Sequence, residues 1–217
     1  MKYDKHSFVE LFPAVPKALA ALTVAGLLSA CSQPDAPSLE DLNASYEAAM
    51  AATADRAVIF APGSETELQV LNRTAEFFAG MTSESVNDQV SGVYAADGYL
   101  NDNVVGIFGM EEIGAYFAHA ASQSEVLDVK FLDVARSDTD YYIRWEMTVV
   151  APVLAGGEPV VSYGTTQFRF DADGRVLIHK DFWDASTGMY EHIPFIGALT
   201  KYVHAKLAAG AEPATDH

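Results

Sequence analysis

The sequence has little positive charge and almost no cysteine. Lysine and arginine together number 13 against 30 aspartate and glutamate residues, so the formal net charge is −17. Such a surface repels phosphate backbones, and no basic patch offsets it, which argues against nucleic acid as a partner. The single cysteine, Cys31, excludes a disulfide within the chain.

Motifs for metals, cofactors and covalent catalysis are also missing. The six histidines show no metal-ligand spacing, and there is no glycine-rich phosphate loop or nucleophile elbow. We therefore expect no metal and no cofactor. Half of the 217 residues are hydrophobic, which is enough for one domain with a real core.

The lone cysteine follows a short apolar segment near the N-terminus. Residues 18–28 form an apolar run too short for a normal transmembrane helix, and basic residues precede it. The run ends in LLSAC, which resembles the lipobox of bacterial lipoproteins. The resemblance implies a signal peptide over residues 1–30 and an acyl lipid such as palmitate on Cys31, which would anchor the chain in a membrane of the cell envelope. Ser32 resembles the sorting signal for the periplasmic side of the Gram-negative outer membrane. The alternative interpretation is a buried thiol in a core helix.

The remaining chain is expected to hold a tether, a main domain and a tail. Residues 31–62 combine a polar tether with a helix that begins after Ser38, residues 63–209 form the domain, and residues 210–217 form a disordered tail. Within the domain, Leu68, Leu71, Ala75 and Phe78 mark the inward face of a first helix. Further helices are expected over 83–94, 110–121 and 195–209, and strands over 126–135, 141–150, 160–170 and 175–183. This order predicts an α+β fold with a curved antiparallel sheet.

Four segments give the domain a family resemblance. The stretches VYAADGYLNDNVVGIFGMEEIGAYF, YYIRWEM, TTQFRFDADGRV and HKDFWD resemble, in order and spacing, the SnoaL-like branch of the nuclear transport factor 2-like superfamily. That superfamily includes ketosteroid isomerase, polyketide cyclases and limonene-epoxide hydrolase. The resemblance covers about residues 64–207. It implies a cone-shaped fold, in which the curved sheet wraps around helices and leaves a pocket between them.

The last strand carries the first candidate site. Because side chains alternate along a strand, Leu177, His179, Asp181 and Trp183 should share one face. The resemblance places this face in the pocket, with Asp181 matching the acid/base aspartate of polyketide cyclases and of the epoxide hydrolase. His179 could share a proton with it. The alternative is that Asp181 caps the strand or bridges to an arginine, while His179 only fills space.

The segment YLNDN supplies a second candidate. By resemblance, Asp102 occupies the position of the proton-shuttling aspartate of ketosteroid isomerase. Tyr99 and Asn101 match the pair that positions water in the epoxide hydrolase. The alternative is a polar turn, since Asn and Asp are common turn residues.

The sequence also differs from the resembled enzymes at several site positions. At the oxyanion-hole positions of the isomerase it has Phe78 and Thr166, which disfavours ketosteroid isomerisation. Arg144 and Glu146 resemble an Arg-x-Asp pair of the epoxide hydrolase, but strand alternation turns them away from the pocket.

Two functions remain open at this point. The first is an envelope-anchored binding or accessory protein, and the second is a cofactor-free lyase, isomerase or hydrolase that uses Asp181 with His179 or Asp102. The binding protein would use either the pocket or the outer face of the sheet, without chemistry. A small apolar ligand is the candidate occupant of the pocket, and the sheet is a candidate homodimer surface. The aromatic residues Phe78, Trp145, Phe168 and Trp183, together with Tyr99 and Asn101, are the predicted ligand-binding residues.

The lipobox generates a direct prediction. Replacing the acceptor, Cys31→Ala, should leave an unprocessed precursor without acyl chains, because no other thiol can take the lipid. Metabolic labelling with a radioactive fatty acid measures this. Equal labelling of the variant and the wild type would refute the anchor.

Overall fold

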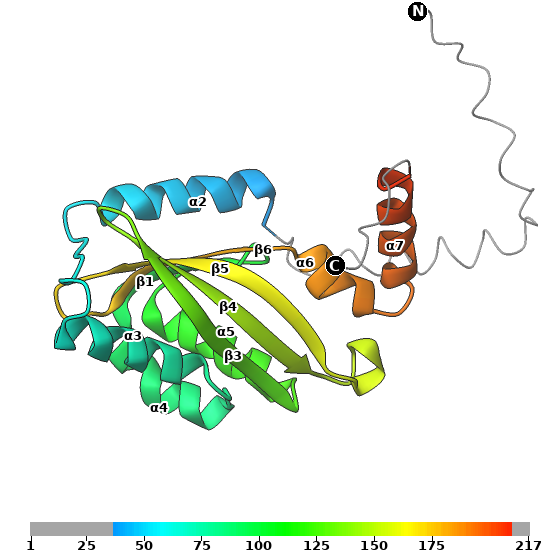
Figure 1. Ribbon diagram of the computed structural model, residues 1–217, viewed down its shortest axis with the longest axis horizontal. Helices are drawn as coiled ribbons and strands as arrows, with labels where there is room; N and C mark the ends of the chain where they lie inside the picture. Colours follow the sequence, from blue (N-terminus) through cyan, green and yellow to red (C-terminus); the bar gives the residue numbers. More distant parts are fainter. Residues whose placement is uncertain (1–36, 210–217) are drawn as a thin grey trace, which may run out of the picture. The chain divides into compact units, whose positions relative to one another are not determined.

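The computed structural model describes residues 37–209, in which one sheet of six strands carries helices on both faces (Figure 1). The helices are α2 (Leu39–Ala52), α3 (Glu65–Phe78), α4 (Ser83–Val93), α5 (Met110–Ser122), α6 (Ala185–Gly188) and α7 (Ile196–Leu207), with short 3-10 turns η2 (Ala155–Gly157) and η3 (Tyr190–His192). The strands are β1 (Tyr94–Asn101), β2 (Gly106–Phe108), β3 (Val126–Arg136), β4 (Tyr141–Val150), β5 (Val160–Phe170) and β6 (Val176–Trp183).

The sheet has the strand order β2-β1-β6-β5-β4-β3. Strands β3 to β6 pair antiparallel in sequence order, as the hairpin pattern predicted, and the α+β class with a curved sheet is confirmed. One pair differs from the expected antiparallel sheet, because β1 runs parallel to β6. Within β1, the register of the pairing with β6 shifts between Tyr94 and Tyr99.

Helices α3, α4 and α5 cover one face of the sheet and enclose the larger core with it. The inward face of α3 is only partly as predicted. Phe78 is buried, but Leu68 is 51% exposed, and Val70 and Phe77 are buried although they were not expected on this face. Glu67 lies on the inward side of the helix as well, where it is buried and accepts hydrogen bonds of 2.6 and 2.8 Å from Arg136. The inward face of α3 therefore includes a charged residue that an apolar pattern does not predict.

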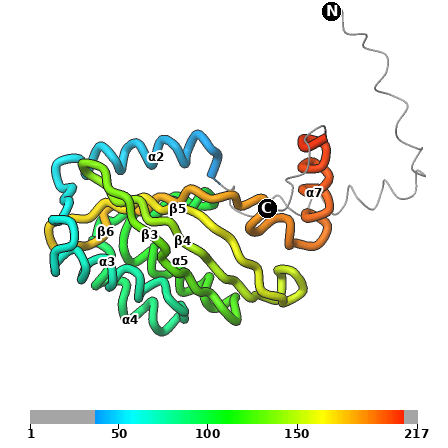
Figure 2. The backbone as a smooth tube through the Cα atoms, viewed as in Figure 1, coloured from blue at the N-terminus to red at the C-terminus, as the bar shows by residue number. Residues whose placement is uncertain are grey.

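Helix α2 covers part of the opposite face, and Figure 2 shows the chain passing from α2 around the sheet to α3. Arg169 of β5 points toward α2. Its guanidinium donates to the Met50 carbonyl oxygen of α2 at 3.0 Å and to the carboxylate of Asp140, which directly precedes β4, at 2.8 and 3.0 Å. Tyr46 of α2 donates to Gln167 at 2.6 Å. The expected helix after the tether is therefore bonded into the domain.

The predicted homodimer stays a prediction. It now concerns the part of this outer face that α2 leaves exposed, around Tyr163 and Phe182.

The C-terminal helix α7 packs onto η3, where His204 bonds Glu191 at 2.6 Å. Several of its apolar side chains, including Leu199 and Tyr202, are exposed. Within residues 37–209, no helix has both the length and the apolar character that crossing a membrane requires. The signal peptide, Cys31 and the tail over 210–217 lie outside the described residues.

The buried ion pair of Arg169 and Asp140 predicts a large stability effect. Arg169→Met removes the partner of a carboxylate that is only 5% exposed, so we expect the free energy of unfolding to fall by about 3–5 kcal/mol. Equilibrium urea unfolding of the full chain measures this. The matched control is Arg144→Met, whose ion pair with Asp133 is exposed and should leave the unfolding midpoint nearly unchanged. Equal effects of the two substitutions would contradict the prediction.

Candidate functional site

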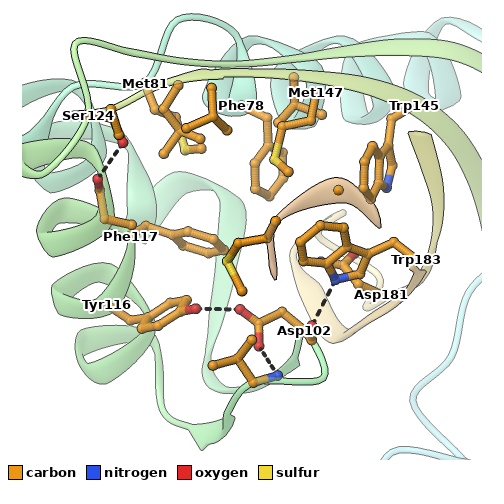
Figure 3. Close-up of a pocket in the computed structure, with 18 of the residues that line it drawn as sticks. Phe78, Met81, Asp102, Tyr116, Phe117, Ser124, Trp145, Met147, Asp181 and Trp183 are labelled. Atoms are coloured by element: carbon orange, nitrogen blue, oxygen red, sulfur yellow. Dashed lines mark hydrogen bonds between the residues drawn. The ribbon is translucent and has the colours of Figure 1, made fainter. Parts of the chain in front are cut away.

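A cavity of about 360 Å³ lies between the sheet and the helices of the larger core (Figure 3). Its wall is mostly aliphatic and aromatic. Asp102, Thr166, His179 and Asp181 form one group of polar residues in it, and Gln123 and Ser124 are the others. His179 and Thr166 are buried, whereas Gln123 and Val153 at other parts of the wall are exposed, so the group of four lies toward the inner end. The other wall residues include Phe78, Met81, Tyr116, Phe117, Leu127, Phe131, Trp145, Met147, Phe168, Trp183, Met189 and Ile193.

A bulge in β6 aims its polar residues into this cavity. Phe170 pairs with Val176, but the next residue back on β5, Arg169, pairs with Ile178, so β6 holds one extra residue. Leu177 consequently joins the smaller core under α2, although simple alternation placed it with His179. Beyond the bulge the alternation resumes, and His179, Asp181 and Trp183 all line the cavity as predicted.

A chain of hydrogen bonds runs through the inner end of the cavity. The Tyr94 hydroxyl lies 2.6 Å from His179 Nδ1, and His179 Nε2 lies 3.0 Å from Asp181 Oδ1. Thr166 donates its hydroxyl hydrogen to the same Asp181 oxygen and accepts a bond of 2.8 Å from Trp145 Nε1. Five side chains from β1, β4, β5 and β6 are thereby held in one network.

The network fixes where the protons lie. With Asp181 ionised, His179 donates from Nε2 to the carboxylate and accepts from the Tyr94 hydroxyl at Nδ1. Burial, and next the negative charge of Asp181, raise the pKa of Tyr94 well above its usual range, so this phenol stays protonated. Both donors on Asp181 converge on Oδ1, and no side chain or backbone group of residues 37–209 bonds to Oδ2.

The second carboxylate, Asp102, is held by a different set of bonds. Its Oδ1 accepts from the backbone N–H groups of Val104 and Val105, both at 2.9 Å, and its Oδ2 accepts from the Tyr116 hydroxyl. Trp183 Nε1 donates to the Asp102 carbonyl oxygen at 3.0 Å, so Tyr116 and Trp183 reach this residue from opposite sides (Figure 3). Asp102 therefore forms the predicted polar turn and also lines the cavity.

Comparison with known proteins agrees with this geometry. Residues 74–179 match the family model described as the SnoaL-like domain. This part of the chain is similar to the SnoaL-like domain. Among solved structures, an NTF2-like protein of unknown function from Burkholderia pseudomallei is 16% identical, with a TM-score of 0.50 over 60% of this chain and 99% of that one. An LEH-like epoxide hydrolase from M. tuberculosis is 12% identical, with a TM-score of 0.49 over 67% of this chain and 96% of that one.

At 16% identity, the similarity to the Burkholderia pseudomallei structure shows the NTF2-like fold and nothing finer. No curated protein sequence matches the chain. In the part of the SnoaL-like domain and its flanks that the structure describes, no three of His, Cys, Asp and Glu converge as metal ligands would.

Two of the expected ligand-binding residues do not reach the cavity. The Tyr99 hydroxyl lies 2.8 Å from Ser45 Oγ of α2, and Asn101 bonds the Leu42 carbonyl oxygen and Lys180 Nζ. Both therefore face α2, because odd-numbered residues at this end of β1 point away from Asp102. Strand alternation by itself predicts that Tyr99 and Asn101 lie on one face of β1 and Asp102 on the other.

The structure brings the remaining candidates together. Phe78, Trp145, Phe168 and Trp183 all line the cavity, while Arg144 pairs with Asp133 on the exposed side, as alternation predicted. Sequence reasoning missed Tyr116 and Phe117 of α5, although a helix packed over the pocket had to present some of its aromatic residues to it. It also missed Tyr94, which no local pattern links to His179, 85 positions later.

The Tyr94 bond can be tested without knowing a ligand. Tyr94→Phe leaves the buried Nδ1 of His179 without a partner, so we expect the free energy of unfolding to fall by about 1–3 kcal/mol. Urea unfolding gives the value. As a matched control, Tyr163→Phe removes an exposed hydroxyl that donates to Glu146 and should hardly move the midpoint. If Tyr94→Phe were as neutral as the control, the network would contribute nothing to this site.

Proposed function

We propose that this chain is a lipoprotein of the bacterial cell envelope whose SnoaL-like domain binds a small apolar molecule. The observation that carries the proposal is the cavity, whose volume of about 360 Å³ lies in the range of pockets that enclose small molecules. Binding would bury apolar surface of both the ligand and the cavity wall. Each Å² of apolar surface removed from water stabilises the complex by about 25 cal/mol. The few polar groups at the inner end would orient it.

The lipobox supports the location. Five residues lie between Cys31 and Pro37, the first described residue, so an acyl group on Cys31 would be joined to the described part of the chain by at most about 20 Å of extended backbone. A lipid anchor of this kind would hold the domain at a membrane surface. Small apolar molecules concentrate there, which suits a binding or accessory protein in the envelope.

A second candidate function is acid/base catalysis by Asp181. The Tyr94–His179–Asp181 chain of hydrogen bonds favours it, because it holds a carboxylate and a proton donor in fixed positions beside the cavity. Against it stands the lack of an oxyanion hole, since Phe78 cannot donate and the Thr166 hydroxyl is committed to Asp181. A substrate turned over by the wild type and only bound by Asp181→Asn would support this candidate.

The binding proposal makes a prediction about two alanines of α5. Ala120 lines the cavity and Ala115 is exposed on the same helix. Ala120→Leu should fill part of the cavity and weaken binding of the neutral probe 1-adamantylmethanol by about tenfold or more, whereas Ala115→Leu should leave binding unchanged. Both tryptophans line the cavity, so their fluorescence should change saturably as the probe binds.

Each titration uses the full chain in detergent and is corrected against detergent alone. Trp183→Phe should remove most of the fluorescence change. Failure of the wild type to give a saturable signal, or equal weakening by both leucine variants, would overturn the proposal.

A further inference from the structure

The polar groups at the inner end of the cavity offer acceptors but no free side-chain donor. The other two polar residues of the wall, Gln123 and Ser124, lie outside this inner group and donate to Ser122 Oγ and the Ala120 carbonyl oxygen. Two carboxylates, Asp102 and Asp181, lie in the wall, and Oδ2 of Asp181 has no partner among residues 37–209. No lysine or arginine lines the cavity in this described part of the chain. Lys180, the nearest in sequence, bonds Asn101 on the α2 side of the sheet instead.

Each side-chain donor on the inner wall is already used within the protein. Trp145 donates to Thr166, and Thr166 donates to Asp181. Tyr116 and Trp183 both donate to Asp102, the first to its carboxylate and the second to its carbonyl oxygen. A ligand that must accept hydrogen bonds would therefore have to break one of these bonds, at the cost of an unpaired buried group.

Two carboxylates and no lysine or arginine lie in the described cavity wall. Burial raises the pKa of the Tyr116 phenol well above its usual range, and the negative charges of Asp102 and Asp181 raise it further. Both carboxylates thus disfavour a second negative charge on this residue of the wall. An anionic ligand would meet the same repulsion.

Aromatic rings surround this negative region. The indoles of Trp145 and Trp183 lie with their ring centroids 6.4 Å apart, and Tyr116, Phe117 and Phe168 also line the wall. The faces of such rings attract cations, most strongly when water is excluded. Rings and carboxylates together resemble the surroundings that proteins provide for organic ammonium groups.

We infer that the ligand of this cavity is a protonated apolar amine, whose ammonium group donates to Asp181 Oδ2 while its hydrocarbon part fills the aromatic space. This inference rests on the proposed binding function and adds the chemical class of the ligand. Carboxylates, phosphates and enolate-like species are excluded by the same inventory, because the inner wall offers them no free donor.

The test compares three probes that share one hydrocarbon cage. They are 1-adamantylmethylamine, 1-adamantylmethanol and 1-adamantanecarboxylate at pH 7, titrated into the full chain under identical detergent conditions. The amine should bind at least tenfold more tightly than the alcohol, as expected for one charge-assisted hydrogen bond. The carboxylate should bind more weakly than the alcohol.

The variant Asp181→Asn isolates the charge. An asparagine oxygen can keep the bonds from Thr166 and His179, so the fold should be retained, while its NH₂ group replaces the free oxygen. The amine preference should fall below about threefold, with alcohol binding unchanged. Asp173→Asn, in an exposed turn, makes the same change in net charge and should leave the preference intact.

The outcomes separate this inference from the proposed function. If the alcohol binds as tightly as the amine, or the carboxylate binds best, the amine inference is wrong and the binding function stands. An amine preference that survives Asp181→Asn also overturns the assignment to this residue. If no probe binds, both the inference and the proposed function fail.

Discussion

Burial of β6 on both faces is the constraint on which the rest of the domain depends. Residues 176–179 are all buried, with α2 over one face of the sheet and α3 to α5 over the other. Polar side chains on the central strands cannot reach water and need partners inside the protein. Arg169 bonds to Asp140 on the α2 side, and His179 bonds to Tyr94 and Asp181 on the cavity side. The polar end of the cavity is thus held by hydrogen bonds that belong to the fold itself, so its geometry does not depend on a ligand.

The fold followed from the sequence where the determining signals are local. Strands β4 and β5 begin and end at the predicted residues, because alternation and the flanking turns mark them. The buried face of α3 could be predicted only in part, since Glu67 lies on it and bonds to Arg136, 69 positions later. The parallel pairing of β1 with β6 likewise depends on contacts between distant segments. The family resemblance supplied the overall architecture that these local signals leave open.

For the site, the sequence was a better guide to strands than to partners. His179, Asp181 and Trp183 were correctly assigned to one face, because the period of two holds beyond the bulge. Tyr99 and Asn101 face α2 instead of the cavity. The family resemblance predicted the opposite, whereas the period of two places both residues on the other face from Asp102. The hydroxyl donors that hold the carboxylates come from other elements, and no spacing within one segment reveals such pairings. The sequence of a strand therefore predicts which hydrogen-bond acceptors share a face. It does not predict which donors from other elements will bond to them.

The extra residue in β6 has an evolutionary consequence. It lets Leu177 and Ile178 both face α2, while Val176 and His179 both face the larger core. A one-residue deletion at Leu177 would restore regular alternation and keep Asp181 on the cavity face, whereas deletion of Lys180 would turn Asp181 and Trp183 away from the cavity. A change in strand length at the bulge would therefore preserve the acidic site, while the same change at Lys180 would remove it.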